Sequence, residues 1–90
     1  MFHHGHHELH GVTVVVETIG TATYVGRFDS EDQAGVHLVD VGIHDAASGG
    51  DVTRDEYVQR SAKVGVRTDR KHLVVPRADV SRIIPLGEID

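Results

Sequence analysis

Histidine is the residue type in this sequence most able to do chemistry by itself. Five of the eight histidines fall within the first ten residues: His3, His4, His6, His7 and His10. Several are three or four positions apart, a spacing that would put them on one face of a helix and that suits Zn, Ni or Cu. Gly5 and Gly11 interrupt the segment, however, and leave it without the rigid support of a structural zinc site. We predict a flexible or short helical arm over 1–11 whose Zn or Ni binding is adventitious, with a specific metal site as the alternative.

The second chemical feature is a group of cations in the later part of the chain. The net charge is −5, which argues against non-specific nucleic-acid binding because that binding depends on neutralising phosphates. Residues 51–82 nevertheless hold eight cations and five acids, whereas residues 1–50 hold one cation and seven acids. A local RNA site would use the cations of this stretch. The candidates are Arg67, Arg70, Lys71, His72, Arg77 and Arg82. The alternative is a salt-bridged surface or a subunit interface, because Asp69 and Asp79 lie among them.

Other kinds of site lack a matching motif. The chain has no cysteine, so disulfides and thiolate metal sites are excluded. The serines lack a nucleophile-elbow context, and Ser48-Gly49-Gly50-Asp51 has no lysine behind it to make a phosphate loop. We therefore expect neither an enzyme nor a cofactor. No signal peptide and no apolar run of roughly 20 residues is present, which predicts a soluble cytoplasmic protein with no membrane partner.

The elements that position these residues are predicted to be short strands. The β-branched run over 12–19 favours a strand, Gly20-Thr21 a turn, and residues 22–28 a second strand. A polar turn over 29–35 precedes a third strand over 36–43. Short strands separated by turn signals indicate an all-β barrel or sandwich, and a barrel suits a chain of 90 residues.

Alternation along these strands predicts which side chains share a face. Tyr24 and Phe28 fall on one face by the period of two, and Gly26 between them suggests a bend or a close backbone approach. In the third strand the same rule predicts two sets on opposite faces. These are Val36, Leu38 and Asp40 on one face, and His37, Val39 and Val41 on the other.

The middle of the chain reads as an insertion over 44–62, with small residues and glycine indicating a loop over 44–52. Thr53-Arg54-Asp55-Glu56 fits a capping box, which predicts a helix over 54–61; an extended segment is the alternative. Three further segments read as strands. They are 62–68, then 73–75 ended by Pro76, and a last strand through Val80, Ile83 and Ile84 ended by Pro85, with a turn over 69–71.

The order of these residues resembles the Sm-like (LSm) family. The first motif of that family is a strand, a glycine turn, a strand with an internal glycine, an acidic turn, and a strand that ends in an acidic residue. Its second motif is a short strand, a tight turn, and a strand with two apolar residues three positions apart. The matching residues are Val14 and Val16, Gly20, Tyr24 to Phe28, Asp32, Leu38 to Asp40, and Leu73 to Ile83. The resemblance implies a small five-stranded, strongly bent antiparallel barrel over 12–90, here with a long insertion between the third and fourth strands.

The family usually assembles rings by pairing edge strands, so the resemblance implies a homo-oligomeric ring that binds RNA or a protein partner. In the family a Met-Asn pair reads uridine. This sequence departs from the family there, because it has Ala34-Gly35 at the corresponding positions. Near Pro76-Arg77 the glycine of the family's Arg-Gly is missing, although Arg77 keeps a group for phosphate contact or stacking. Two alternatives remain open: a homo-oligomeric protein-interaction module without nucleic acid, and metal binding through the histidine arm.

Overall fold

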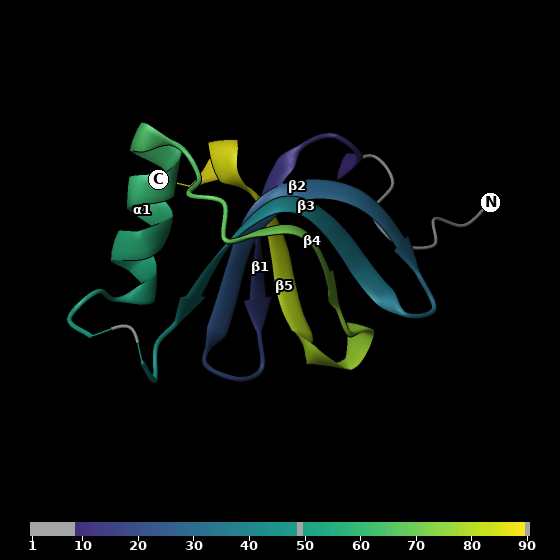
Figure 1. Ribbon diagram of the computed structural model, residues 1–90, viewed down its shortest axis with the longest axis horizontal. Coiled ribbons are helices and arrows are strands. Elements are labelled where there is room, and N and C mark those ends of the chain that lie inside the picture. The colour runs from purple at the N-terminus through teal and green to yellow at the C-terminus, as the bar shows by residue number, and fades with distance from the viewer. Residues whose placement is uncertain (1–8, 49, 90) are drawn as a thin grey trace.

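The computed structural model describes residues 9–48 and 50–89, and it contains one antiparallel sheet of five strands (Figure 1). The strands are β1 (Thr13–Thr18), β2 (Ala22–Asp32), β3 (Gly35–Asp45), β4 (Arg70–Val75) and β5 (Val80–Pro85). One helix, α1 (Arg54–Val64), lies between β3 and β4 in the chain, and two single turns of 3₁₀ helix, η2 (Arg77–Asp79) and η3 (Leu86–Glu88), flank β5. The predicted fold class, a small all-β fold of five strongly bent antiparallel strands, is confirmed.

The order of the strands in the sheet is β4-β3-β2-β1-β5. Consecutive strands β1, β2 and β3 form hairpins, and the chain then returns so that β4 pairs with β3 and β5 pairs with β1. In the described part of the chain no strand pairs with the outer edge of β4 or of β5. The sheet curves without closing through hydrogen bonds, and it therefore keeps two open edges.

Apolar side chains cover both faces of the sheet, and β1 is the strand that explains this arrangement. Successive side chains of a strand point to opposite faces. Val14 and Val16 lie in the inner cluster around Phe28, whereas Val15 packs on the other face against Val25 and against Val58 of α1. The three consecutive valines of β1 are each at most 1% exposed. A strand buried on both faces requires an unbroken apolar run, which is what 14–16 provides.

The bend of the sheet is centred on Gly26 and Asp40. Arg27 pairs with Val39 and Val25 pairs with Gly42, so Asp40 and Val41 together face Gly26 as a bulge. A β-carbon on Gly26 would come within 3.2 Å of the backbone of this bulge, which confirms the close approach predicted at this glycine. Asp40 has a φ of 52°, a left-handed conformation that aspartate tolerates better than most residues.

The bulge corrects the predicted faces of β3. The alternation holds for Val36 and Leu38, but the extra residue at Asp40 shifts the pattern by one position. Val41 therefore joins Val36 and Leu38 in the inner cluster, and Asp40 is exposed. In β2, Phe28 is buried in this cluster and Tyr24 packs against it, which confirms that these two share a face.

The helix forms where the capping box predicts it, so the extended alternative is wrong. The Thr53 hydroxyl accepts a hydrogen bond from the Glu56 amide at 3.1 Å, and the Glu56 carboxylate accepts one from the Thr53 amide at 3.2 Å. The helix continues to Val64 and ends at Gly65, whose φ is 96°. The strand predicted over 62–68 is therefore wrong, because its first three residues complete the helix and the rest have no regular structure.

The remaining boundaries also differ from the predictions. Strand β4 begins at Arg70 rather than after a turn over 69–71. Strands β2 and β3 extend through most of the predicted turn 29–35 to a two-residue connection.

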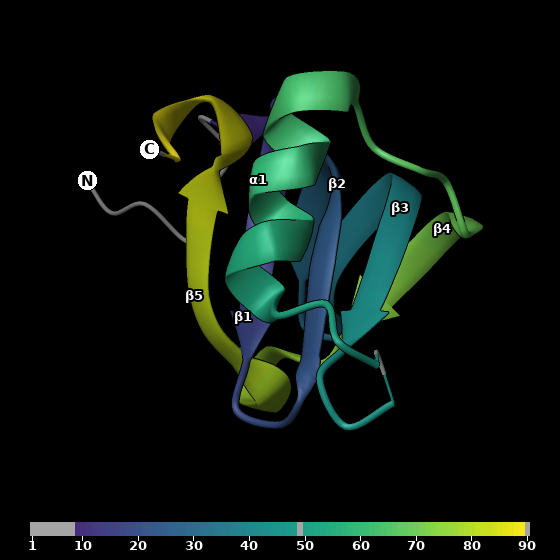
Figure 2. The same cartoon turned by 90° about the vertical axis from the view of Figure 1, so that its left-hand side faces the viewer.

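The helix covers the face of the sheet opposite the inner cluster, here called the outer face. Figure 2 shows α1 lying across this face, where Val58 packs against Val15 and Val25. Among the described helices, none is long and apolar enough to cross a membrane.

Candidate functional site

The six predicted RNA-contacting residues do not form one cluster. Arg67 lies in the segment that precedes β4, and three others lie on β4 itself: Arg70, Lys71 and His72. Arg77 is in η2, and Arg82 is on β5, the strand at the other end of the sheet order. The structure therefore brings together four of the six residues around one open sheet edge.

Three of these cations are held by carboxylates of the same chain. Arg77 lies 3.3 Å from Glu31 and Arg82 lies 3.2 Å from Glu17, and both carboxylate side chains are largely buried. Arg67, whose side chain is 91% exposed, lies 3.9 Å from Asp69 in a looser pair. These contacts agree with the salt-bridged alternative for the three arginines, because a guanidinium bound to a carboxylate is less available to a phosphate.

Arg70 and Lys71 differ from those arginines. Both are exposed, and within the described residues neither makes an ion pair. They stand on the strand whose outer edge is unpaired. The β4 edge therefore combines free backbone hydrogen-bonding groups with two available positive charges.

His72 makes a contact that the sequence pattern did not predict. Its Nε2 atom lies 3.3 Å from Nδ1 of His37 on the neighbouring strand, and Nε2 of His37 lies 2.9 Å from the Asp32 carboxylate. The hydrogen bond to His37 is the main reason that the pKa of Asp32 lies below its usual value. The structure thus places a carboxylate and two imidazoles in a row beside the β4 edge.

The predicted metal-binding arm lies mostly outside the described residues, which include only His10 of its five histidines. The His10 ring is hydrogen-bonded to the Asp29 carbonyl, and the preceding Leu9 packs against the inner cluster. Across residues 9–48 and 50–89 no group of three or more histidine, aspartate or glutamate side chains could hold a metal ion.

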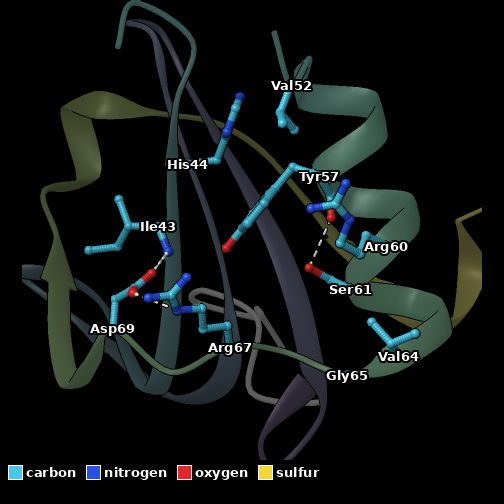
Figure 3. Close-up of a pocket in the computed structure, with 10 residues that line it drawn as sticks. All are labelled: Ile43, His44, Val52, Tyr57, Arg60, Ser61, Val64, Gly65, Arg67 and Asp69. Carbon is cyan, nitrogen blue, oxygen red and sulfur yellow. Dashed lines mark hydrogen bonds and ion pairs between the residues drawn. The ribbon is translucent and has the colours of Figure 1, made fainter. Parts of the chain in front are cut away.

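A pocket of 390 Å³ lies between α1 and β3, and sequence reasoning missed it (Figure 3). Its lining combines apolar, aromatic and charged side chains from the helix, the strand and the segment before β4. The lining residues are Ile43, His44, Val52, Tyr57, Arg60, Ser61, Val64, Gly65, Arg67 and Asp69. The capping box is the sequence signal that could have pointed to it, because a helix placed after β3 must pack somewhere on the sheet.

Two aromatic rings form the wall of this pocket. The rings of Tyr57 and His44 stack with centroids 5.0 Å apart and planes inclined by 19°. The Tyr57 hydroxyl and the Nε2 atom of His44 are buried, and neither has a hydrogen-bond partner. Burial, with a smaller contribution from the Asp69 carboxylate, raises the pKa of Tyr57. A buried polar atom without a hydrogen-bond partner is energetically unfavourable. In the described part of the chain, this wall is where buried side-chain atoms lack hydrogen bonds.

Asp69 holds the segment before β4 against β3. Its carboxylate accepts a hydrogen bond from the Ile43 amide at 2.9 Å, and its own amide donates to the Val41 carbonyl at 2.7 Å. These bonds fix the floor of the pocket directly beside the start of β4. The pocket and the basic sheet edge therefore adjoin, and together they define a surface built from α1, β3 and β4.

Comparisons with known proteins identify the fold of this small domain. No family model matches the sequence, and no curated protein is similar to it in sequence. Among solved structures, a chain in the crystal structure of the NatC complex bound to CoA is similar in fold, with a TM-score of 0.58 and 20% sequence identity. The match covers 93% of this chain and 87% of that chain, so the similar chain has a comparable length.

These comparisons correct the predicted membership of the Sm-like family. The bent five-stranded sheet is present, but no family model matches the chain, and a solved structure with a similar fold is a chain of the NatC complex. The physical reason is that the resemblance depends on glycine and β-branched positions that any small, strongly bent sheet requires. Such positions predict a fold without identifying a family.

Proposed function

We propose that this protein is a non-enzymatic interaction subunit of a protein complex, and that it contacts other chains through the surface built from α1, β3 and β4. The observation that carries the proposal is the open β4 edge, with exposed Arg70 and Lys71, next to the pocket under α1. An unpaired edge strand is a template on which another chain can add a strand, and a neighbouring pocket supplies side-chain specificity.

The similarity to a chain of the NatC complex supports this proposal. That chain belongs to a complex, and it shares the fold of the present chain along most of its length. The ion pairs of Arg67, Arg77 and Arg82 favour a protein partner over RNA, because they leave only Arg70 and Lys71 without an ion pair among the arginines and lysines predicted to contact RNA. Homo-oligomerisation and RNA binding are therefore outcomes for the experiment to separate. The proposed subunit needs no cofactor.

The test is affinity purification of the tagged full-length chain from its native cells, followed by quantitative mass spectrometry and light scattering. We expect a protein to co-purify in a fixed ratio and to be lost when Lys71→Glu reverses a charge on the β4 edge. Arg54→Glu is the matched control, because it makes the same charge change at an exposed position in the first turn of α1. Arg54 does not line the pocket beside β4 but a separate hollow that it shares with Glu17 of β1 and Arg82 of β5. The Arg54→Glu variant should retain the partner.

Four outcomes would contradict the proposal. The first is a chain that purifies as a monomer without a partner, and the second is a homo-oligomer without any other protein. The third is a co-purifying nucleic acid whose removal by ribonuclease also removes every protein partner, which would favour RNA binding. Loss of the partner in both variants equally would place the interface elsewhere.

A further inference from the structure

The pocket between α1 and β3 has an apolar lining that continues onto the surface. Ile43, Val52 and Val64 contribute aliphatic side chains to this lining, and Tyr57 contributes an aromatic ring. Val64, at the end of α1, is 77% exposed and is the most exposed large hydrophobic residue in the described part of the chain. The pocket volume of 390 Å³ lies in the range of about 300–1,000 Å³ that is usual for binding pockets. The pocket therefore has the size and the apolar rim to receive a large apolar group.

The polar atoms of the pocket wall are not available to such a group. The Tyr57 hydroxyl and Nε2 of His44 are themselves buried. The Ser61 hydroxyl already donates a hydrogen bond to the Tyr57 carbonyl at 3.0 Å. A nucleobase is recognised by stacking together with hydrogen bonds to its edges, and these wall atoms offer it no such bonds. The wall therefore favours an apolar side chain over a nucleobase.

Two arginines give the mouth of this pocket a positive charge. Figure 3 shows Arg60 on α1 and Arg67 on the segment before β4, on opposite sides of the pocket. Arg60 is exposed and makes no ion pair within the described residues. Arg67 is paired only loosely, because its guanidinium lies 3.9 Å from Asp69, the one acidic residue of the described lining. The mouth is thus positive in a chain whose net charge is −5.

We propose that this pocket receives one large apolar side chain of the partner protein, and that Arg60 and Arg67 pair with acidic residues on either side of it in the partner sequence. The inference rests on the proposed function and specifies the segment of the partner that binds. An apolar anchor in a pocket with charges at its rim is the usual arrangement of an interface. A positive rim attracts an acidic segment and disfavours a basic one.

The positive surface continues from the pocket to the open sheet edge. Asp69, on the pocket floor, is followed directly by Arg70 and Lys71 of β4, which are exposed and make no ion pair within the described residues. An acidic segment anchored in the pocket would therefore meet two further cations as it runs toward β4. The proposed anchor and the proposed edge contact can belong to one continuous segment of the partner.

The first experiment identifies the segment that enters the pocket. The full-length chain with the photoreactive substitution Val64→benzoylphenylalanine is irradiated in an extract of its native cells, and cross-linked peptides are sequenced by mass spectrometry. Val64 is exposed, so this substitution leaves the core unchanged. We expect a protein segment that has a large apolar residue with acidic residues on both sides. A basic segment, a segment without a large apolar residue, or a nucleic-acid adduct would overturn the inference.

The second experiment measures the contribution of the charges and of the anchor. The cross-linked segment is synthesised as a labelled peptide, and its binding to the full-length chain is followed by fluorescence anisotropy. Arg60→Glu should weaken binding about tenfold, whereas Arg60→Lys should retain most of it. Replacing the apolar residue of the peptide by alanine should also weaken binding about tenfold. Arg54→Glu is the matched control, because Arg54 lies on the same helix outside the pocket. Arg67→Glu provides a second variant if Arg60→Glu does not fold.

Failure of this inference differs from failure of the proposed function. A partner that is lost with Lys71→Glu but binds the Arg60→Glu and Arg67→Glu variants as tightly as the unchanged chain would leave the proposed function standing and overturn the inference. The same holds for a partner that co-purifies but gives no cross-link from position 64. If no protein co-purifies, the proposed function is wrong and the inference fails with it.

Discussion

The two faces of the sheet are built very differently. The inner face buries seven residues in one cluster around Phe28, and these come from four of the five strands. On the outer face the buried hydrophobic cluster of the described residues contains only Val15, Val25 and Val58, and the last of these belongs to the helix α1, which covers this face. The described cluster of the inner face consists of hydrophobic side chains, which have no polar atoms to satisfy. The outer face contains the pocket, where the Tyr57 hydroxyl and Nε2 of His44 are buried without a hydrogen-bond partner. The comparison indicates that the inner face contributes most of the stability, whereas the outer face contains the pocket of the proposed interaction surface.

The largest expected effect is on the inner face. Phe28→Ala should lower the free energy of unfolding by about 3–5 kcal/mol, because it leaves a cavity at a side chain that is 1% exposed. Val58→Ala on the outer face should cost only about 1.6 kcal/mol, since it removes two methyl groups at about 0.8 kcal/mol each. Urea denaturation monitored by circular dichroism measures both. Equal losses would show that the two faces contribute alike.

An intermediate effect is expected at the start of α1. Thr53→Ala removes the hydroxyl that caps the helix and should lower the free energy of unfolding by about 1 kcal/mol. Thr53→Ser keeps the hydroxyl and serves as the control. Hydrogen exchange should show faster exchange in α1 than in β1–β3 for the alanine variant. A uniform acceleration over the whole chain would mean that the helix and the sheet unfold as one unit.

The smallest effect should be a gain in stability. Tyr57→Phe removes a buried hydroxyl that has no partner, so we expect the free energy of unfolding to rise by about 0.5 kcal/mol. Because burial raises the pKa of Tyr57 in the folded chain, the unfolded chain ionises first above about pH 10, and wild-type stability falls there. The phenylalanine variant lacks this contribution. A loss of stability at neutral pH would indicate that the hydroxyl has a partner in solution.

The sequence predicted the features that depend on neighbouring residues. The capping box at Thr53 indicated where the helix begins, and the valines of β1 indicated a strand, because both signals are local. The end of the helix was missed because Val64 and Val66 alternate like a strand, although Val64 is the exposed last residue of α1. Tertiary context decided between two conformations that local preference left nearly equal.

The missed features depend on pairing between distant parts of the chain. The bulge at Asp40 arises where β3 crosses Gly26 of β2, so alternation within β3 alone assigned Val41 to the wrong face. The His37–His72 contact joins residues 35 positions apart, and only the β3–β4 register brings them together. The candidate surface was predicted in part, since Arg70 and Lys71 were identified, whereas its pocket required knowledge of how α1 packs.

The position of α1 in the chain has a consequence for how this protein can diversify. The segment between Asp45 and Arg70 leaves from β3 and returns to β4, and these strands are already adjacent and hydrogen-bonded. The cost of closing a loop changes slowly with its length, so segments of other lengths could join the same two strands. Any replacement would only have to cover Val15 and Val25. We therefore expect that a different segment could replace the helix, in evolution or by design, and change the surface next to β4 while the register of the strands is retained.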